Sequence, residues 1–308
     1  MKEKITILFP VYKEKTEIID LALNSILNQT FKDFILRIRL DAPDNLEAQE
    51  YFIKKMNDDS RIEFEVNEEN VGLAKTLNRM MCNIETKYIA RMDADDIAFE
   101  NRLEEQYKFM ESNKNIDLCG TNIIYINSDG EQLKYNERIP TLHKYISIYL
   151  KYNNCMAHPT YFMKKEVIDN IKYRDDLRYA QDYEFMCRCV EAGYNIANLD
   201  KYLLYYRTCE VSPSKLLRQN LIAYYVKYYY RRKKISSNPP IAEKVEKYIL
   251  NNDEEILLDS VSIKKSIYNL FKSNKSIKKR ILSCLPRRYR IDLLNGKVIL
   301  FYIKKIMK

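Results

Sequence analysis

Three aspartates at the end of a short apolar segment are the residues best suited to metal chemistry in this chain. Residues 88–92 (YIARM) are followed by Asp93, Ala94, Asp95 and Asp96. Such a segment is typical of a buried strand that delivers acids to the rim of a sheet. On an extended chain the carboxylates of Asp93 and Asp95 point the same way and can face one hard cation, Mg²⁺ or Mn²⁺. The alternative is a solvated acidic turn that caps the next helix.

The elements around these acids favour the metal site. Strand-like and helix-like segments alternate four times over roughly the first 110 residues, which predicts an α/β fold with a doubly wound, mostly parallel sheet. The expected strands cover residues 5–11, 34–40, 62–66 and 88–92. In such sheets, ligands bind beyond the carboxyl ends of the strands. Residues 10–12, Asp41 and residues 93–95 all fall at those ends.

A glycine-rich phosphate loop is absent from the sequence. The chain has five glycines, and neither G-x-G-x-x-G nor G-x-x-x-x-G-K-[ST] occurs. A nucleotide bound here would therefore not have its phosphates held by such a loop. A metal held by the aspartates would have to neutralise them.

The pattern changes after residue 115. Residues 116–127 form a long strand-like run, and Ser128-Asp129-Gly130 is a good hairpin turn. A helix is expected to begin near residue 181 and to end at Gly193. Residues 195–206 are again strand-like and lead to Arg207.

Seven short motifs, in one order, resemble family 2 glycosyltransferases of the GT-A fold. They are FPVYKE (9–14), LDAPD (40–44), NVGLAKTLN (70–78), ARMDADD (90–96), HPT (158–160), QDYEF (181–185) and LLYYR (203–207). The resemblance covers about the first 210 residues and implies a catalytic domain over residues 1–212. It points to the bacterial branch that builds capsule, lipopolysaccharide and lipid-linked glycans. The implied donor is UDP-galactose, UDP-glucose or a UDP-N-acetylhexosamine, and the implied acceptor is a glycan or a lipid-linked glycan.

The resemblance also implies roles for individual residues. The positions that match donor-nucleotide contacts are Pro10, Val11, Tyr12, Glu14, Asp41, Asn70, Asp93, Ala94 and Arg207. Asp41 matches the acid that reads the uracil, and Arg207 is placed near the diphosphate. Asp93 and Asp95 match the pair that holds the metal, with Asp95 as the direct ligand. Asp182 matches the catalytic base on the acceptor side.

The chemistry of sugar transfer needs this division of roles. The reaction passes through an oxocarbenium-like state while the diphosphate leaves with growing negative charge, which a bound metal stabilises. A separate carboxylate must take the proton of the attacking hydroxyl, and a single displacement inverts the anomeric centre. Asp182 is expected to be that base. The structural alternative for Asp182 is an acid in the first turn of a helix.

One position departs from the family pattern. The family often places a histidine two residues after the arginine of the YYR motif, as a further metal ligand, and this chain has Cys209 there. Cysteine is a soft ligand and suits Mg²⁺ poorly. His158 is as consistent with a structural hydrogen bond as with the acceptor side. The seven cysteines show no CxxC pair, which favours free, buried thiols in a reducing cytoplasm.

The net charge of +9 is concentrated at the end of the chain. Residues 264–308 contain 14 Lys and Arg against one acid, Asp292, so the rest of the chain is net acidic. The region 213–308 is predicted to be a basic, tyrosine-rich helical extension. Such a composition suits an anionic bilayer surface, which predicts a cytoplasmic enzyme peripheral to the inner face of the cell membrane. The alternative is an ordinary helical subdomain that packs on the catalytic domain and has a solvated basic face.

Three other functions compete with this interpretation. A nucleotidyltransferase would carry a glycine-rich loop after the first strand, and FPVYKE is not one. A nucleic-acid-binding protein is disfavoured because the main domain is net acidic. A relative that binds nucleotide sugars but is inactive stays open because of Cys209.

Overall fold

The computed structural model describes residues 4–133, 139–209 and 211–250 of the chain. The lysine-rich tail from Lys264 to Lys308, and with it most of the predicted extension, lies outside these residues. One compact unit comprises the chain up to residue 212 together with residues 218–242, and the other includes residues 213–217 and 243–250. The predicted functional division at residue 212 stays a prediction, while by packing residues 218–242 belong to the first unit.

The first unit is built on one mixed sheet with the strand order β3-β2-β1-β4-β7-β6-β8-β5. The strands are β1 (Ile5–Val11), β2 (Phe34–Leu40), β3 (Ile62–Val66), β4 (Tyr88–Arg91), β5 (Ile97–Ala98), β6 (Leu118–Ile126), β7 (Phe162–Lys164) and β8 (Ile196–Arg207). The strands β3, β2, β1 and β4 are parallel neighbours, and β6 is parallel to β8. Antiparallel pairs join β4 to β7, β7 to β6, and β8 to β5. The predicted α/β sheet of mostly parallel strands is confirmed.

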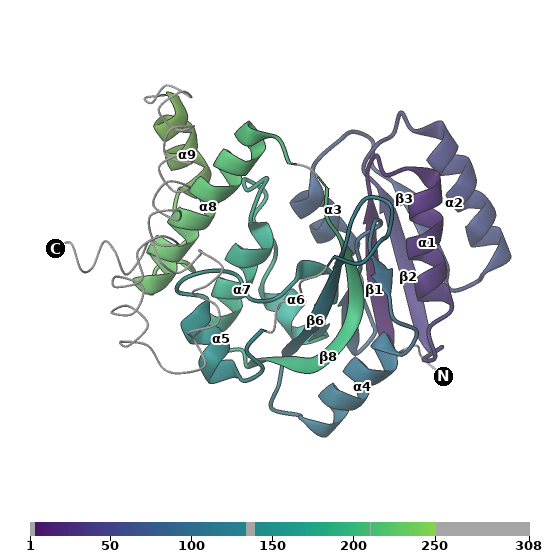
Figure 1. The fold of residues 1–308 in the computed structure, drawn as a ribbon, viewed down its shortest axis with the longest axis horizontal. Coiled ribbons are helices and arrows are strands. Elements are labelled where there is room, and N and C mark those ends of the chain that lie inside the picture. The colour runs from purple at the N-terminus through teal and green to yellow at the C-terminus, as the bar shows by residue number, and fades with distance from the viewer. Residues whose placement is uncertain (1–3, 134–138, 210, 251–308) are drawn as a thin grey trace. The chain divides into compact units, whose positions relative to one another are not determined.

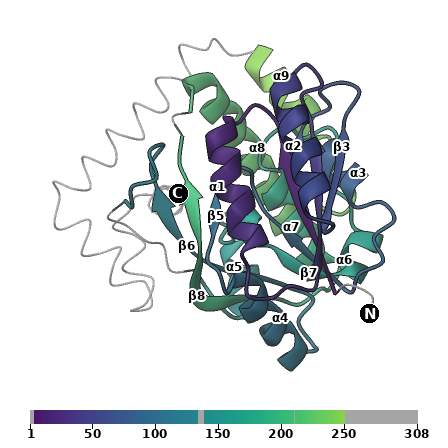
Figure 2. The ribbon, with the colours of Figure 1, turned by 90° about the vertical axis from the view of Figure 1, so that its right-hand side faces the viewer.

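Helices cover both faces of the parallel strands (Figures 1 and 2). The helices are α1 (Thr16–Leu27), α2 (Leu46–Asp58), α3 (Leu73–Met80), α4 (Arg102–Ser112), α5 (His143–Tyr149), α6 (Lys165–Asn170), α7 (Gln181–Glu191), α8 (Pro213–Arg231) and α9 (Ile241–Leu250), with a short 3₁₀ helix at His158–Thr160. Helices α1 and α2 lie side by side on one face, and α3 lies on the other face (Figure 1). This is the arrangement of a doubly wound sheet.

The residue pattern explains the core. All seven residues of β1 are buried, as expected for a central strand covered on both faces. In β2 buried residues alternate with half-buried ones, so one side of this strand packs against α1 and α2. The buried side of α1 carries Ile19, Ala22, Leu23 and Ile26, which follow helical spacing. Burial of this apolar surface positions the strand ends where the polar residues of the motifs lie.

The later elements also follow the sequence predictions. Residues 127–131 form the expected turn, in which Gly130 has a φ of 87°. Helix α7 ends where predicted, because Gly193 takes a φ of 92° that suits glycine. Residues 218–242 pack into the first unit through Ile222, Val226, Tyr230, Ile235 and Ile241, all buried. Among the residues that the structure describes, no helix has the length and apolar character needed to cross a bilayer.

Candidate functional site

The three aspartates converge at the carboxyl end of β4. The strand ends at Arg91, and the chain turns at Ala94 and Asp95. A carboxylate oxygen from each of Asp93, Asp95 and Asp96 lies within 4.8 Å of the others. The predicted cluster is confirmed, but its geometry is that of a turn and not of an extended chain with alternating side chains. The turn brings Asp96 into the group, a residue that the pairing of Asp93 with Asp95 left out.

Asp93 is held by a buried arginine. Both terminal nitrogens of Arg91, which is 2% exposed, donate to the two carboxylate oxygens of Asp93. Such a fork fixes the orientation of a carboxylate as well as balancing its charge. The buried Arg102 supports this strand end by donating from Nη2 to the Arg91 carbonyl over 2.6 Å. Asp93 is therefore the member of the acidic cluster whose charge is already paired.

Asp95 and Asp96 lie in the turn without such a fork. Burial, with Asp93 and Glu14 nearby, raises the pKa of Asp95 to about 7. Burial and the neighbouring Asp93 and Asp95 raise the pKa of Asp96 well above its usual value. Asp96 is 1% exposed, and its Oδ2 is buried without a hydrogen-bond partner among the described residues. Oxygen donors crowded in this way fit a hard divalent cation, which would offset their repulsion and satisfy Oδ2.

Arg207, at the end of β8, ties the acidic turn to the neighbouring hairpin. Its backbone amide donates to Asp96 Oδ1 over 2.8 Å, and its Nε donates to the Asp95 carbonyl over 2.8 Å. Its Nη1 donates to the carbonyls of Asn127 and Ser128. These bonds make Arg207 a positioning residue for the turn. Its predicted contact with a diphosphate stays a prediction.

The predicted donor loop follows β1 directly. Pro10 and Val11 are buried at the strand end, whereas Tyr12 is exposed. The Tyr12 amide donates to Glu14 Oε2 over 2.7 Å, which closes a tight turn. Burial and, to a smaller extent, the charge of Asp93 raise the pKa of Glu14. The strands β1 and β4 are parallel neighbours, so the loop after β1 and the acidic turn after β4 leave the sheet at the same edge. The loop and the turn thus lie close to each other.

Asp41 organises the loop that precedes α3. Its Oδ1 accepts from the Asn67 side chain over 2.8 Å and from the Val71 amide over 2.9 Å, and its Oδ2 accepts from the Gly72 amide over 2.8 Å. The exposed Asn70 donates to the Asp41 carbonyl over 3.0 Å. The motif NVG is therefore bound to the end of β2 by Asp41. A carboxylate offers about four acceptor positions, so one remains for a ligand.

Asp182 lies in the first turn of α7, as expected. Asn154 donates from Nδ2 to Asp182 Oδ2 over 2.7 Å. Burial raises the pKa of Asp182, against the lowering effects of the Tyr183 amide, Arg91 and Asn154. The residue before the helix, Ala180, has a φ of 51°, in the left-handed region that costs energy for alanine.

Tyr161 connects strand β4 with helix α7. Its carbonyl accepts from the Arg91 amide over 2.9 Å, and its hydroxyl donates to the Asp182 carbonyl over 3.3 Å. His158 is buried and bonds through Nε2 to the Tyr173 hydroxyl over 2.6 Å. Burial and Arg91 keep the pKa of His158 well below its usual value, so the ring is neutral. These contacts support a structural hydrogen-bonding role for His158, one of the two roles considered from the sequence.

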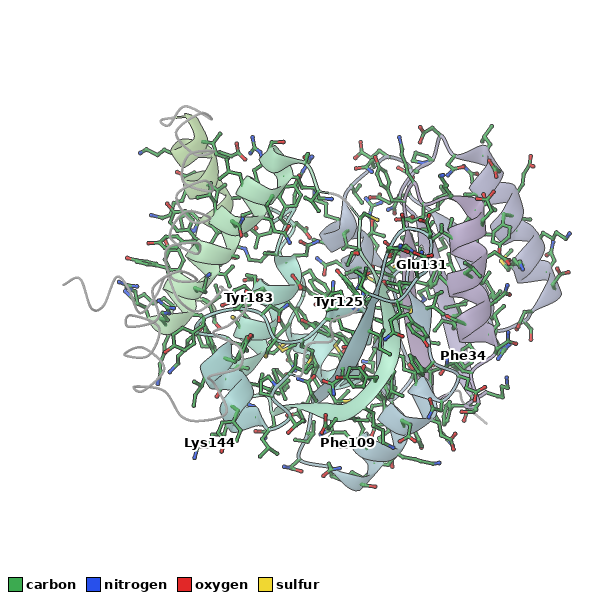
Figure 3. All side chains as sticks on the ribbon, in the orientation of Figure 1. Phe34, Phe109, Tyr125, Glu131, Lys144 and Tyr183 are labelled. Atoms are coloured by element: carbon green, nitrogen blue, oxygen red, sulfur yellow. The ribbon has the colours of Figure 1, made fainter. Side chains whose placement is uncertain are left out.

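Sequence reasoning missed Asn154 in this region and gave no role to Tyr206, although Tyr206 lies in the motif LLYYR. Asn154 carried no motif signal, because nothing in its sequence neighbourhood points to Asp182. Tyr206 lies opposite Tyr125 (Figure 3) in the parallel pair β6–β8, with ring centroids 5.7 Å apart. Burial raises the pKa of Tyr206, and the charges of Asp96, Asp93 and Asp182 raise it further.

Cys209 does not belong to the acidic cluster. The grouped metal-ligating side chains of the described residues are the three aspartates alone. Cys209 and Cys82 are exposed free thiols, whereas the sequence predicted buried ones; the other described cysteines are free and buried. The family's histidine position is thus not replaced by a metal-bound cysteine in this arrangement.

The doubly wound sheet with an acidic turn after its fourth strand, together with a helix carrying a separate carboxylate, defines a GT-A glycosyltransferase architecture. The model of the family "Glycosyl transferase family 2" matches residues 6–172. The chain belongs to glycosyltransferase family 2. Helix α7 and Asp182 lie beyond the matched residues.

Relatives extend the match past that range. An uncharacterised glycosyltransferase of Methanocaldococcus jannaschii, MJ1057, is 34% identical over 226 residues, covering 73% of this chain and 78% of the relative. The O-antigen biosynthesis glycosyltransferase WbnJ of Escherichia coli is 34% identical over 213 residues, covering 67% and 79%.

The fold is also similar to that of solved structures of S. aureus TarS. Crystal structures of S. aureus TarS 1–349 with UDP-GlcNAc and with UDP match at TM-scores of 0.56 and 0.54, with 19% and 21% identity. The matches cover 72% and 73% of this chain, and 66% and 65% of those chains. At this identity the likeness concerns the fold alone.

Proposed function

We propose that this chain is a metal-dependent, inverting hexosyltransferase that moves a sugar from a UDP-sugar to a glycan or lipid-linked acceptor. The observation that carries the proposal is the pair of carboxylate sites: the acidic turn at 93–96 and, apart from it, Asp182 at the start of α7. TarS, which shares the fold, was crystallised with UDP and with UDP-GlcNAc, which supports a UDP-sugar donor.

In this proposal the turn holds the donor. Asp95 and Asp96 would hold Mn²⁺ or Mg²⁺, with Asp93 beside them in the Arg91 fork. When bound, the ion supplies a Lewis acid that stabilises the charge developing on the departing diphosphate. Arg207 keeps the turn in place through its bonds to Asp95 and Asp96.

The nucleoside is assigned to the strand ends beyond β1 and β2. The Asp41 carboxylate already accepts three hydrogen bonds. Its fourth acceptor position is assigned to the N3–H of uracil. Pro10, Val11, Tyr12, Glu14 and Asn70 border this region, and the exposed ring of Tyr12 is available to a flat base. Ala94 keeps the turn small enough for a close approach of the phosphates.

The acceptor side is assigned to α7. Asp182 would accept the proton of the attacking hydroxyl, and its raised pKa brings it nearer to the range where proton transfer is efficient. Attack from the face opposite to the departing diphosphate inverts the anomeric centre.

The setting proposed for the reaction is polysaccharide synthesis at the cytoplasmic face of the membrane. WbnJ is named for O-antigen biosynthesis, and AmsE of Erwinia amylovora, 34% identical over 139 residues, for amylovoran biosynthesis. Residues 231–234, at the end of α8 and directly after it, are basic and exposed. The rings of Tyr224 and Tyr228 on α8 are exposed as well. These features support peripheral binding to an anionic bilayer.

The test is UDP release from UDP-glucose, UDP-galactose and UDP-GlcNAc with Mn²⁺, with Mg²⁺ and with EDTA. We expect metal-dependent release from one donor, abolished in Asp95→Ala. Calorimetry of UDP binding with and without Mn²⁺ accompanies the assay. No release from any donor together with no metal-linked UDP binding would overturn the UDP-sugar assignment.

A second candidate is a nucleotide-sugar-binding protein without transferase activity, because Cys209 lies apart from the acidic cluster. It predicts metal-linked UDP binding and no turnover of any donor. Turnover that is lost in Asp182→Asn and kept in the exposed control Asp169→Asn would exclude it.

A further inference from the structure

The loop that leads from α6 to Asp182, residues 171–180, is bound to distant parts of the first unit on two sides. Its first half is largely buried: Tyr173 is 3% exposed and Arg174 is 8% exposed. A buried loop needs partners for its backbone groups, and here those partners come from α3 and from the segment after α8. The two sets of bonds are made by Asn78 and by Arg174.

Asn78 binds the loop to α3. Its Nδ2 donates to the Tyr173 carbonyl over 2.8 Å, while its Oδ1 accepts from the Tyr173 amide over 2.9 Å. The same Nδ2 also donates to Asp175 over 2.7 Å. Asn78 is the last residue of the motif NVGLAKTLN, whose first residues surround Asp41. One short segment therefore contacts both the nucleoside side and the loop of the acceptor side.

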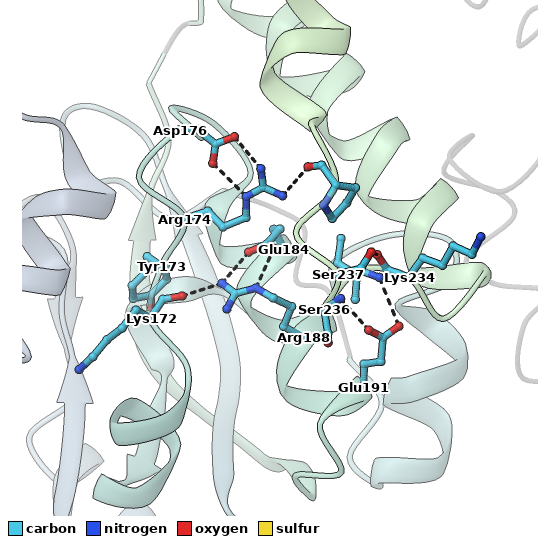
Figure 4. Close-up of polar contacts among 12 residues, drawn as sticks. Lys172, Tyr173, Arg174, Asp176, Glu184, Arg188, Glu191, Lys234, Ser236 and Ser237 are labelled. Carbon is cyan, nitrogen blue, oxygen red and sulfur yellow. Dashed lines mark hydrogen bonds and ion pairs between the residues drawn. The ribbon is translucent and has the colours of Figure 1, made fainter.

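Arg174 binds the loop to the segment that follows α8 (Figure 4). Its Nε and Nη2 form a fork with Asp176 at 2.9 and 2.6 Å, and its Nη1 donates to the Pro239 carbonyl over 2.7 Å. The same segment is fixed to the end of α7, because Glu191 accepts from the Ser236 amide over 2.6 Å. Residues 235–239 thus hold both the loop and α7.

The loop packs against α7, the helix that carries Asp182. The Tyr173 ring stacks on Phe185 of α7 with centroids 4.4 Å apart, and the Tyr173 hydroxyl bonds to His158. Arg188 of α7 donates to the Lys172 carbonyl over 2.6 Å while paired with the buried Glu184 (Figure 4). The loop then ends in the left-handed Ala180, two residues before Asp182.

We propose that Asn78 and Arg174 are positioning residues for the acceptor-side base, acting through the 171–180 loop. This inference rests on the proposed role of Asp182. The loop fixes the direction in which α7 starts, and neither side chain contacts the acidic turn. Loss of either set of bonds lets the carboxylate of Asp182 move, and a displacement of about 1 Å can reduce turnover roughly 100-fold.

The test compares Asn78→Ala and Arg174→Ala in the full chain. Asn24→Ala is the matched control for asparagine, because Asn24 is also a helical residue whose Nδ2 donates to an aspartate, Asp20, and it lies in α1, away from the loop. Arg61→Ala is the matched control for arginine, because Arg61 also forms a fork with an aspartate two residues away and donates to one carbonyl. The readouts are UDP affinity and binding stoichiometry by calorimetry with Mn²⁺, and UDP release from the panel donor that the native chain turns over fastest.

We expect kcat per UDP-binding site to fall roughly 10- to 100-fold in both variants, with UDP affinity and donor KM unchanged and the controls near native. The acid limb of the pH profile of kcat should also shift, because the surroundings of the Asp182 carboxylate change. Arg174→Lys should recover part of kcat by reaching Pro239. Native kcat per binding site in both variants, with Asp182→Asn inactive, would overturn the positioning role alone. Activity retained in Asp182→Asn would instead overturn the proposed base and this inference with it.

Discussion

Asn154 donates a 2.7 Å hydrogen bond to Oδ2 of Asp182, from a segment 28 residues earlier in the chain. The bond favours the ionised carboxylate and so opposes the rise in the pKa of Asp182 that burial causes. After the Tyr183 amide and Arg91, Asn154 is thus a further group that lowers the pKa of the proposed base against the effect of burial.

Asn154→Ala should raise the pKa of Asp182 further. We expect the acid limb of the kcat profile to shift to higher pH by about one unit, the usual size of a hydrogen bond to a charged group. The measurement is UDP release between pH 5 and 9. Asn153→Ala, one residue away, is the control, and an unshifted limb in Asn154→Ala would contradict this role.

Asp182→Asn should lower kcat by about 10²- to 10⁴-fold and raise stability at neutral pH. A carboxyl whose folded pKa is raised favours folding below its unfolded pKa of about 3.9, and that contribution is lost as the pH rises through the folded pKa. The neutral amide avoids this loss, so Tm at pH 7.5 should increase by about 2 °C.

The gain in Tm should largely vanish near pH 3, about one unit below the unfolded pKa, where Asp182 is mostly protonated in both states. Thermal unfolding at the two pH values checks the sign, with the exposed Asp169→Asn as the control. A lower Tm for Asp182→Asn at pH 7.5 would mean that the carboxylate stabilises the fold.

Asp96→Asn should weaken Mn²⁺ binding without unfolding the turn. The amide oxygen can still accept from the Arg207 backbone, but the buried Oδ2, unpartnered among the described residues, becomes a donor that faces the cation. We expect the Mn²⁺ dissociation constant to rise roughly 10- to 100-fold, the range found for changes around metal ligands. Calorimetry of Mn²⁺ alone checks this. Equal affinity in Asp96→Asn and in the exposed control Asp129→Asn would exclude Asp96 as a ligand.

Replacing Arg232, Lys233 and Lys234 together by glutamine should weaken binding to anionic vesicles. These residues are exposed at the end of α8, and the Arg232 guanidinium lies 3.6 Å from the ring centroid of the exposed Tyr228. At about 1 kcal/mol for each basic residue near the surface, binding should fall up to roughly 100-fold.

The measurement is co-sedimentation with phosphatidylglycerol vesicles, with phosphatidylcholine vesicles as the neutral reference. The matched control replaces Lys54, Lys75 and Lys108, which removes the same charge elsewhere. Equal loss in both triple variants would show that net charge, and not the end of α8, governs binding.

The apolar runs made the strands predictable, and with them the edge of the sheet where Asp41 and Asp93 lie. The local turn at Ala94 and Asp95 was not predictable from spacing, because alternation along a strand and a tight turn can both bring two acids together. The side-chain hydrogen bonds of Arg207 were also not predictable, because they go to backbone carbonyls, which every residue has.

The packing of residues 218–242 agrees with the alternative of a helical subdomain packed on the catalytic domain, but its contacts were not predictable for the same reason. The Arg174 bond to Pro239 and the Arg231 bond to Lys151 use backbone carbonyls, which leave no signature in residue type. Composition described this segment as basic and rich in tyrosine, which is true of its exposed side. Its buried side, with Val226 and Ile235, contacts the rest of the first unit.

The left-handed conformation of Ala180 lowers the stability of the fold but restricts the direction in which α7 starts. A left-handed alanine costs about 1–2 kcal/mol that glycine would not cost, yet glycine would enlarge the range of directions from which α7 can start. Directed evolution for heat resistance alone would be expected to select glycine here and to lose turnover. To obtain a more thermostable and still active protein, Ala180 should therefore be kept, and stabilising substitutions should be placed away from α7.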